Sequence, residues 1–504
     1  MGSLEQFINE YVPKIAAKQK QVYQALWLLE TTGSKDAADL NASLDVELRL
    51  LYHDPKIYQK LLDWKKGVHS PLVERQLNIL IRHFKQNQIA KELLEEIARK
   101  EATLLYSYAN FRPLFSGKPI TENGIRALLK TEKDENVRKQ AWETSKQIGD
   151  HLAPQILELV KLRNRAAQSL GYPDYFQMQL DLQEVDEKWL FQTLEQLYND
   201  SEQGYTRTIQ QIKAQGPLHP WDWAEPFAQE DPIDSNELDQ LIKDADFAQV
   251  SHDFYQRMGI DVKQILDRSD MFEREGKNQH AFCIHMDREG DIRNLNNVKP
   301  TLKWFETVLH ELGHAIYELG FDSALPWLLK EPPHMITTEA MALIAGRQAY
   351  LPTTLRHLSK DETLIHKARE SLRRRQLIFS RWVLVMTYFE RELYQNPQQD
   401  LNKLWWQLVQ KFQHIVPPPG REGKNDWAAK YHIGLAPVYY FSYLLGELFA
   451  STIQAAYPAL DTPEAGHFLN EKLFRPGNSH PWNKLIEQVT GAPLNNKAWV
   501  EQFA

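Results

Sequence analysis

Two histidines and a glutamate in the segment His310-Glu311-Leu312-Gly313-His314 have the types and spacing needed for metal chemistry. On a helix, residues four apart lie on neighbouring turns of one face, so both imidazoles can bind the same ion. Glu311 is adjacent to His310 but points elsewhere on the turn. A general base that holds a water molecule without binding the metal has this position. The segment therefore predicts metal-assisted hydrolysis.

The histidine pair needs a further ligand, because catalytic zinc takes about three protein ligands and leaves one position open. Glu339 is the best candidate. It follows Pro332-Pro333 and Thr337-Thr338 and opens an apolar segment, Ala340 to Ala349, which we expect to form a second helix beside the first. Two imidazoles and one carboxylate could also hold non-haem iron, but the base inside the motif favours zinc.

The segment around the motif has the features of a complete amphipathic helix. Thr301 is suited to be its N-cap and Gly320 to end it. An apolar band runs between them, formed by Leu302, Phe305, Leu309, Leu312, Ile316 and Leu319. The alternative is a chance match, in which both histidines are hydrogen-bonded core or surface residues of an ordinary helix. Glu339 and a tyrosine-rich segment near the C-terminus favour catalysis.

The rest of the chain predicts a mainly α fold. Apolar residues recur at three- and four-residue spacing through the first 215 positions, and only 22 of the 504 residues are glycine. Three segments interrupt this pattern and should be loops or short strands: 216–232, 272–300 and 416–425. Since none of them resembles a flexible linker, we expect one catalytic domain over 1–504, with a helical half (1–215) and a zinc-site half (216–504).

Composition excludes several classes of protein. Apolar residues make up 42 % and charged residues 25 %, as in ordinary folded proteins, and the net charge of -8 argues against a nucleic-acid-binding surface. The basic run Arg373 to Arg375 fits a solvated helix face. No segment predicts a membrane helix or a signal peptide, so we expect a cytoplasmic protein unless a signal has been removed. The single cysteine, Cys283, excludes an intrachain disulfide.

With these residues in place, the sequence resembles the angiotensin-converting-enzyme-like family of zinc peptidases and, more distantly, the thimet-type oligopeptidases. Four blocks carry the resemblance: Phe305 to His314 with Glu339-Ala340, Gln279 to Cys283, Pro417-Pro418 with Ala429 to Ile433 and Pro437 to Phe441, and the weaker Trp223-Ala224-Glu225. The match is residue by residue in the C-terminal half and limited to helical character in the N-terminal half. It implies a large helical peptidase with a deep central cleft, lid helices over that cleft and a few short strands near the zinc site.

The resemblance also assigns roles to residues outside the metal motif. It implies that His432 and Tyr440 stabilise the transition state, and an imidazole and a phenol can indeed donate hydrogen bonds to an oxyanion. It implies that Gln279 to Cys283 form a strand beside the bound peptide, in which Ala281 offers backbone hydrogen bonds to the substrate and His280 contacts it through its side chain. Lys430 stands where the family binds the C-terminal carboxylate of the substrate.

One departure from the family concerns substrate binding. Glu225 stands where the family has a glutamine that also contacts the substrate carboxylate. An acid beside Lys430 would partly neutralise this pocket. Strict release of dipeptides is therefore in question, and oligopeptide cleavage or another carboxypeptidase pattern stays open.

Two further departures concern ions. Tyr439 stands where the animal enzymes have a chloride-binding arginine, so we do not expect chloride activation. Leu343 replaces an acid that should orient a zinc histidine one turn after Glu339. Another acceptor must then do so, and Glu306 is a candidate by position.

Together these patterns predict a zinc peptidase, with one zinc ion per chain, that hydrolyses short peptides and most readily releases C-terminal dipeptides. A metallocarboxypeptidase or an oligopeptidase on the same scaffold is the alternative among enzymes. A catalytically inactive peptide-binding protein is the alternative from another class. Such a protein would be expected to lose the base or a ligand, whereas Glu311 and all three proposed ligands are present. The oligomeric state stays open.

Overall fold

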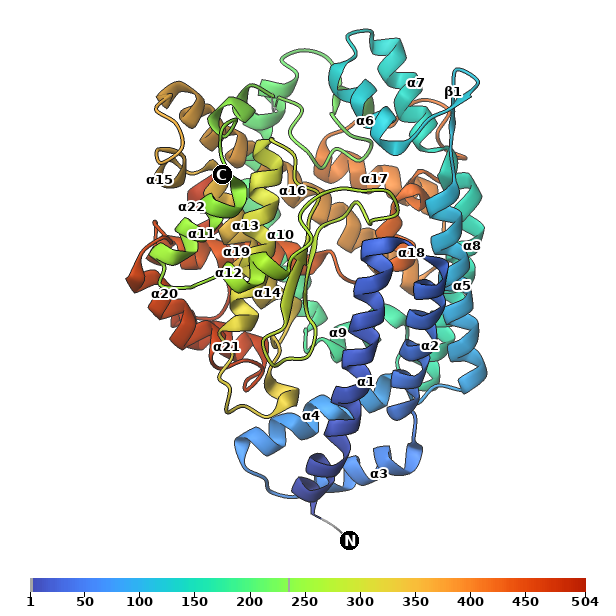
Figure 1. Cartoon of the computed structure of the whole chain (residues 1–504). Coiled ribbons are helices and arrows are strands. Elements are labelled where there is room, and N and C mark those ends of the chain that lie inside the picture. Colours follow the sequence, from blue (N-terminus) through green and yellow to red (C-terminus); the bar gives the residue numbers. More distant parts are fainter. Residues whose placement is uncertain (1–2, 234–235) are drawn as a thin grey trace. The chain divides into compact units, whose positions relative to one another are not determined.

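The computed structural model describes residues 3–233 and 236–504, which form 22 α-helices and two antiparallel two-stranded sheets (Figure 1). The prediction of a mainly α chain with a few short strands is confirmed. The chain forms two compact units, each made of separate segments. Unit 1 comprises Met1–Gln88, Asn236–Arg369 and Leu445–Ala498, and unit 2 comprises Ile89–Ser235, Glu370–Leu444 and Trp499–Ala504. The single catalytic domain and the deep cleft stay predictions.

Unit 1 begins with paired helices and contains the metal motif. Its elements are α1 (Leu4–Thr32), α2 (Lys35–Leu51), α3 (Pro55–Trp64), α4 (Pro71–Gln86), α11 (Phe247–Arg257), α12 (Lys263–Arg268), β3 (Phe282–His285), β4 (Ile292–Leu295), α13 (Leu302–Leu319), α14 (Met335–Arg347), α15 (Pro352–Leu355), α20 (Pro463–Leu469) and α21 (Trp482–Thr490). Ser3, Ser34 and Asp54 cap the first three helices by accepting hydrogen bonds from backbone N–H groups. α1 and α2 lie side by side (Figure 1). Their apolar faces share a buried core with α4 and with Leu328 and Leu329.

Unit 2 contains eight whole α-helices and one two-stranded sheet among the described residues. Its elements are α5 (Lys91–Asn110), β1 (Leu114–Phe115), β2 (Lys118–Pro119), α6 (Glu122–Thr131), α7 (Glu135–Ser145), α8 (Gln147–Ser169), α9 (Tyr175–Leu182), α10 (Glu187–Ile212), α17 (Leu401–Gln413) and α18 (Tyr431–Leu435). Three more helices contain residues of both units: α16 (Glu362–Gln395), α19 (Phe441–Ala456) and α22 (Lys497–Phe503). The helical periodicity of the first 215 residues corresponds to α1 through α10, which end at Ile212.

The predicted metal-site helix forms with the expected ends. The hydroxyl of Thr301 accepts a hydrogen bond from the Trp304 N–H at 3.3 Å, and α13 ends at Gly320. The second helix differs from the prediction of Ala340 to Ala349, because α14 begins at Met335 and places Glu339 in its second turn. The side chain of His334 causes this earlier start, since it caps the helix by accepting from the Ile336 N–H at 2.9 Å.

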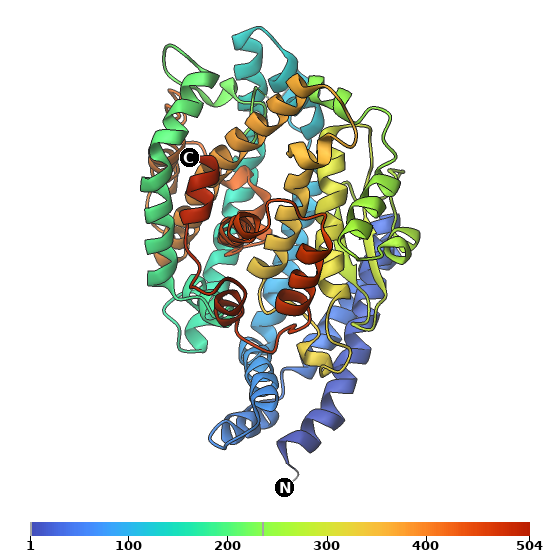
Figure 2. The ribbon, with the colours of Figure 1, turned by 90° about the vertical axis from the view of Figure 1, so that its left-hand side faces the viewer.

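Helices α13 and α14 run side by side, and glycine allows their close approach (Figure 2). A Cβ on Gly313 would lie 2.7 Å from the Cα of Ala342 and 2.9 Å from the carbonyl oxygen of Met341. Both neighbours are backbone atoms and cannot move aside cheaply, so a larger residue would push the helices apart. The glycine inside the motif therefore sets the distance between the histidine helix and the Glu339 helix.

The part of α19 that belongs to unit 1 holds α14 from another side. A Cβ on Gly446 would lie 3.1 Å from the Cβ of Glu339. Two helical turns further along α14, the guanidinium of Arg347 pairs with the carboxylate of Glu447 and also donates to Ser451 Oγ at 3.0 Å. Arg347 is 2 % exposed and Glu447 3 % exposed, so this ion pair is out of water. The pair fixes the helix that carries Glu339.

Arg347→Leu is expected to lower the free energy of unfolding by about 3–5 kcal/mol, because it leaves the charge of Glu447 buried without its main partner. Urea unfolding followed by circular dichroism measures this change. The double variant Arg347→Leu/Glu447→Leu should recover most of the loss, since it removes both charges. A single variant that unfolds at the wild-type urea concentration would show that the pair does not brace α14.

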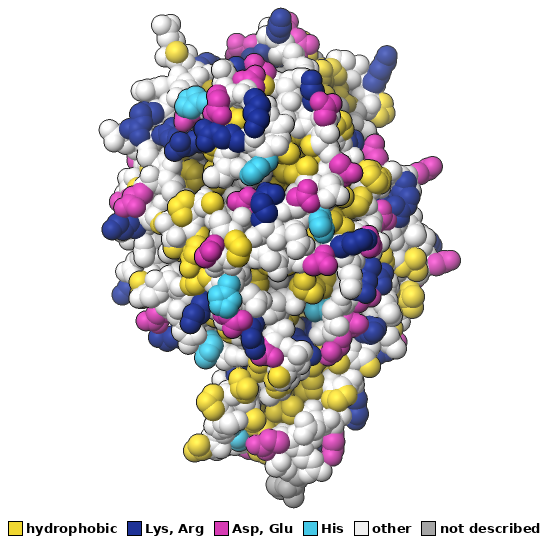
Figure 3. Space-filling view, turned by 60° about the vertical axis from the view of Figure 1, so that its left-hand side comes forward, with side chains coloured by type: hydrophobic (Ala, Val, Ile, Leu, Met, Phe, Trp, Pro, Cys, Tyr) yellow, Lys and Arg dark blue, Asp and Glu magenta, His cyan; other side chains and the backbone are white. Residues whose placement is uncertain are grey.

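The surface mixes charges of both signs. On the face shown in Figure 3, Asp and Glu side chains lie among the Lys and Arg side chains, with apolar side chains between them. Within residues 3–233 and 236–504, no helix has both the length and the apolar character required to cross a membrane.

Candidate metal centre and active site

Helices α13 and α14 bring His310, His314 and Glu339 together in unit 1. One nitrogen of each histidine and one carboxylate oxygen of Glu339 lie within 4.8 Å of one another. The Nε2 atoms of His310 and His314 are 3.8 and 3.9 Å from the same oxygen of Glu339, and the two imidazole planes are nearly perpendicular. Three donor atoms at these separations can converge on one ion. The donor set, two imidazoles and one carboxylate, is one that catalytic zinc uses.

The two histidines are in the protonation state that binds a metal. Burial lowers the pKa of His310 to about 4, against the opposing charge of Glu306. Burial and the neighbouring His310 lower the pKa of His314 to about 3. Both imidazoles are therefore neutral near pH 7, and each has a lone pair available for a cation.

Thr338 orients one of these imidazoles. Its hydroxyl lies 2.6 Å from His314 Nδ1, which leaves Nε2 on the side of Glu339. A hydrogen bond to the outer nitrogen fixes the tautomer and the ring direction of a metal-binding histidine. Sequence reasoning missed this role, although Thr338 directly precedes Glu339. Once α14 is known to begin at Met335, both residues fall on the turn that faces α13.

Glu306, which the sequence suggested for the orienting role, lies one helical turn before His310. Its carboxylate accepts a hydrogen bond from the Tyr350 hydroxyl at 3.1 Å and pairs with Lys303 Nζ at 3.1 Å. Its negative charge opposes the loss of the His310 proton. The charge of Glu306 therefore acts on His310.

Glu311, which lies between His310 and His314 in the sequence, has a buried carboxyl group. It is 6 % exposed, and burial followed by the charge of Glu339 raises its pKa to about 8. A cation held by His310, His314 and Glu339 would oppose the effect of the Glu339 charge on this pKa, because positive charge favours the carboxylate form of Glu311. A carboxyl group in such a place can exchange a proton with a water molecule or an amine near neutral pH.

The short sheet of unit 1 packs against α13. β3 pairs antiparallel with β4, Phe282 opposite Leu295 and His285 opposite Ile292. The family resemblance implied a strand over Gln279 to Cys283, but β3 begins only at Phe282. His280 and Ala281 come directly before it, in a bend where the His280 N–H donates to Asn278 Oδ1 at 2.9 Å. The side chain of Asn278 thus occupies one backbone donor that a strand would have offered.

In unit 2, His432 and Tyr440 lie close together. His432 is in the short helix α18, and Tyr440 directly precedes α19. Their ring centres are 4.8 Å apart at an interplanar angle of 63°. The ring of Trp382 meets the Tyr440 ring edge-on at 5.9 Å. Aromatic packing therefore holds the phenol and the imidazole as a pair.

Lys430 lies in an aromatic pocket of unit 2. Its ammonium group is 5.3, 5.2 and 5.7 Å from the ring centres of Phe227, Trp382 and Tyr440. Gln229 Oε1 accepts a hydrogen bond from Lys430 Nζ at 3.2 Å. Cation–π contacts and one amide oxygen thus hold the ammonium group.

Glu225, the acid that was expected beside Lys430, forms hydrogen bonds within its own turn. The Glu225 carboxylate is fully buried and accepts from the Phe227 N–H at 3.0 Å, the Gln229 N–H at 2.5 Å and Gln229 Nε2 at 3.1 Å. Burial raises its pKa, while the charges of Lys430 and Arg126 oppose this. Glu225 therefore shapes the 225–229 turn, and Gln229 is the residue that reaches Lys430. No sequence signal marked Gln229, because the turn that presents it forms only in the folded chain.

A second lysine borders the same aromatic group. Lys146 is 3 % exposed, and its ammonium lies 3.3 Å from the centre of the Phe227 ring. Burial lowers its pKa to about 7, with the charges of Asp426 and Glu225 opposing the shift. Nothing in the spacing of the sequence indicated that Lys146 and Phe227 would meet.

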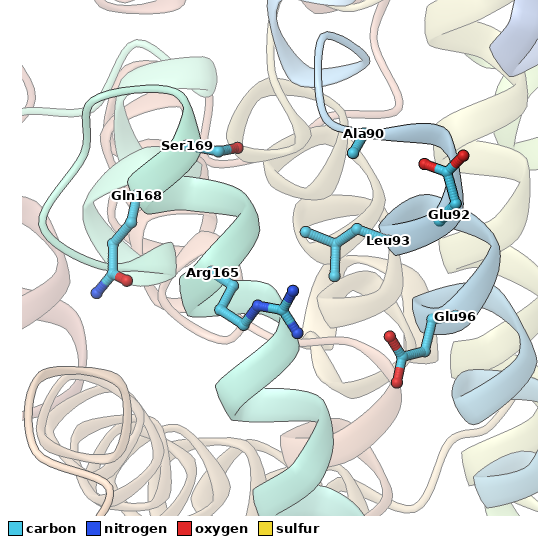
Figure 4. A pocket seen from close by; sticks show the side chains of 7 residues that line it. All are labelled: Ala90, Glu92, Leu93, Glu96, Arg165, Gln168 and Ser169. Carbon is cyan, nitrogen blue, oxygen red and sulfur yellow. The ribbon is translucent and has the colours of Figure 1, made fainter.

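A surface pocket of about 380 Å³ lies elsewhere in unit 2 (Figure 4). The side chains of Glu92 and Glu96 come from α5, and Arg165 points toward them from α8. None of the site residues predicted from the sequence lines it, and its charged groups are ordinary surface residues. It adds no chemistry to the site.

Two family models match the chain. The model described as peptidase family M3 covers residues 128–504, which is more than half of the chain, and the model described as angiotensin-converting enzyme covers residues 2–209. The second match falls largely in the half where the sequence resemblance was limited to helical character. The observed resemblance thus extends along the whole chain.

Three curated proteins illustrate the similarity. Angiotensin-converting enzyme-like protein Ace3 from Mus musculus is 22 % identical over 446 residues, covering 76 % of this chain and 59 % of the mouse protein. Angiotensin-converting enzyme from Haematobia irritans exigua is 26 % identical over 295 residues, covering 51 % of this chain and 47 % of the fly protein. Carboxypeptidase 1 from Bacillus subtilis (strain 168) is 23 % identical over 405 residues, covering 72 % of this chain and 75 % of the bacterial protein.

The match therefore spans about half of the length of the first two relatives and three quarters of the bacterial one. All three similarities are low in identity, whereas the family M3 model matches the region that contains the His310–Glu339 group, His432 and Tyr440. The chain belongs to peptidase family M3.

Proposed function

We propose that the protein is a zinc-dependent peptidase that acts on short peptides, with one zinc ion per chain bound by His310, His314 and Glu339. One observation carries this proposal. Two neutral imidazoles and a carboxylate have donor atoms within 4.8 Å of one another, and the buried Glu311 lies beside them on the same helix. Membership of peptidase family M3 supports it.

The proposed chemistry divides between the metal and the chain. A bound zinc ion supplies Lewis acidity, which lowers the pKa of a water molecule and polarises a peptide carbonyl. Glu311 takes a proton from the attacking water as its oxygen forms a bond to the carbonyl carbon. Glu311 then gives that proton to the peptide nitrogen as the carbon–nitrogen bond breaks. The products are a carboxylic acid and an amine, which at neutral pH become a carboxylate and an ammonium group by proton transfer, and Glu311 returns to its starting state.

His432 and Tyr440 are proposed to stabilise the oxyanion of the tetrahedral intermediate. The family resemblance suggests the role, and the packing of the two rings at 4.8 Å supports it, because preorganised donors lose little freedom during the reaction. His280 and Ala281 are proposed to contact the substrate, again by resemblance. Their place beside β3, which packs against the motif helix, fits that role.

Lys430 is proposed to bind the C-terminal carboxylate of the peptide. The geometry of Glu225 favours this role more than the sequence did, since the acid is engaged by the 225–229 turn and Gln229 faces Lys430. A charge-assisted contact of this kind contributes binding energy that a C-terminal amide cannot replace.

Lys430→Met is expected to raise KM for a peptide with a free C-terminus by about tenfold or more, because a hydrogen bond between charged groups contributes about 1.5–3 kcal/mol. The same peptide with a C-terminal amide should be cleaved with little change. Steady-state kinetics on both peptides checks this. Lys424→Met is the matched control, since it removes a half-exposed lysine from the same region of the chain. An equal loss on both peptides would contradict a carboxylate-binding role.

The cleavage pattern that we propose is release of C-terminal dipeptides. The similarity to proteins named angiotensin-converting enzyme supports it, and the similarity to a protein named Carboxypeptidase 1 supports single-residue release as the second candidate. Mass spectrometry of the products from free and C-terminally amidated peptides separates them. Loss of two residues per cut supports the proposal, loss of one residue supports a carboxypeptidase, and internal cuts in amidated peptides support an oligopeptidase. Absence of cleavage with zinc present would leave a peptide-binding protein.

A further inference from the structure

A buried polar network in unit 2 holds the chain between His432 and Tyr440. Arg163, on α8, is 2 % exposed and donates through Nη2 to the carbonyl oxygen of Gly434 at 2.8 Å. Its Nη1 donates to the Tyr394 hydroxyl at 3.2 Å. Glu390, on α16 and 1 % exposed, accepts a hydrogen bond from the Val438 N–H at 3.0 Å. Two backbone groups of this short segment are thus bound by buried side chains.

Val438 has a backbone conformation that its side chain disfavours. Its φ is 58°, in the left-handed region, which a β-branched residue adopts at a cost in free energy. The residue is 1 % exposed, its N–H donates to Glu390, and its carbonyl oxygen accepts from Gln183 Nε2 at 3.2 Å. The two hydrogen bonds lie on either side of the strained residue and compensate for its conformation.

The strained turn determines where Tyr440 points. Tyr440 follows Val438 by two residues, and its ring is packed between Trp382 and His432. If Val438 relaxed to an ordinary extended conformation, the backbone direction after it would change and the Tyr440 ring would leave this position. The hydroxyl position of Tyr440 is therefore coupled to the hydrogen bond between Val438 and Glu390.

We propose that Glu390 is a positioning residue for the reaction, which holds Val438 in its left-handed conformation and thereby fixes the Tyr440 hydroxyl toward the substrate. The inference rests on the proposed role of Tyr440 in stabilising the oxyanion. In this proposal Glu390 acts through Val438 and not by its own contact with the substrate.

The presence of a buried carboxyl group at position 390 supports a specific role for Glu390 as a hydrogen-bond acceptor. An apolar side chain would fill a buried place on α16 at lower cost, because burying a polar group requires a hydrogen-bonding partner. Burial raises the pKa of Glu390 to about 8, with the charge of Arg163 and the Val438 N–H opposing the shift. Near neutral pH the group is thus mostly a neutral acid, and a glutamine offers the same acceptor oxygen in nearly the same shape.

Glu390→Leu is expected to lower kcat about 10- to 100-fold with little change in KM, because a misplaced catalytic group loses rate without losing substrate contacts. Glu390→Gln should restore kcat to within about threefold of the wild type, as its oxygen still accepts from Val438. Glu392→Leu, on the same helix, is the matched control and should have no comparable effect. A Glu390→Leu variant with wild-type kcat would overturn the inference.

A double-mutant cycle with Tyr440→Phe distinguishes positioning from general destabilisation. If Glu390 acts through Tyr440, Glu390→Leu should lower kcat little further once the hydroxyl is gone. Additive losses would overturn the inference while leaving the role of Tyr440 intact. A Tyr440→Phe variant with wild-type kcat would instead remove the proposed function on which the inference rests.

Gln183→Leu provides the same test at a less buried position. It removes the donor to the Val438 carbonyl and leaves Glu390 in place. If circular dichroism and zinc content show that Glu390→Leu does not fold, Gln183→Leu is the variant that tests the inference. A fall in kcat that disappears in the Tyr440→Phe background supports the inference, and an unchanged kcat overturns it.

Discussion

Glu311→Gln is expected to lower kcat for peptide hydrolysis by about a thousandfold or more, while the zinc content stays at one ion per chain. An amide has nearly the same shape as a carboxylate but cannot accept a proton from water or return one to the leaving amine. General acid–base catalysis by one side chain contributes about 10²–10⁴-fold, and Glu311 is proposed to serve in both directions. The ligands His310, His314 and Glu339 are unchanged in this variant, so metal binding should persist.

Steady-state kinetics together with elemental analysis of the purified variant measures both quantities. Glu464→Gln is the matched control, because it changes an exposed carboxylate of unit 1 on another helix, α20. It is expected to keep kcat within about threefold, as substitutions away from a site usually do. A Glu311→Gln variant that retains most activity would exclude Glu311 as the base.

His314→Ala is expected to abolish zinc binding at micromolar zinc and, with it, detectable hydrolysis. The substitution leaves one imidazole and one carboxylate, and catalytic zinc sites use about three protein ligands. The folded state should survive, because α13 is held by its apolar face and by its close contact with α14. Isothermal titration with zinc and a thermal melt with and without zinc measure the two effects separately.

Thr338→Val is expected to weaken zinc binding less than His314→Ala does. It removes the hydrogen bond to His314 Nδ1 but keeps all three ligands, so zinc affinity should fall about 10- to 100-fold rather than disappear. Equal zinc affinity in wild type and His314→Ala would mean that the ion is held elsewhere. Equal affinity in wild type and Thr338→Val would mean that Thr338 does not orient the imidazole.

The sequence predicted those features that local patterns encode. The caps of α13, its apolar band and the four-residue spacing of His310 and His314 all follow from helix geometry, and the structure has the helix at the predicted bounds. The start of α14 was predicted too late, because its N-cap is a histidine and histidine is uncommon in that role. The spacing of a motif predicts metal ligands well, whereas a helix N-cap formed by an unusual residue type is missed.

The features that the sequence could not predict depend on contacts between distant segments. Gln229 meets Lys430 across 201 positions of the chain, and Glu390 meets Val438 across 48. Residues of this kind have no periodicity or motif of their own. Glu225 is an example, since its carboxylate accepts hydrogen bonds from the backbone of its own turn. Buried polar side chains are satisfied by whichever partner folding brings near them.

The proposed function requires that peptide hydrolysis depend on zinc at the group formed by His310, His314 and Glu339. The decisive measurement is the rate of hydrolysis of one short peptide by the purified protein before chelation, after removal of metal by a chelator, and after addition of one equivalent of zinc. We expect that chelation abolishes hydrolysis, that one equivalent of zinc restores it, and that zinc does not restore hydrolysis by His314→Ala. Hydrolysis at the original rate by protein that contains no metal would contradict the proposed function.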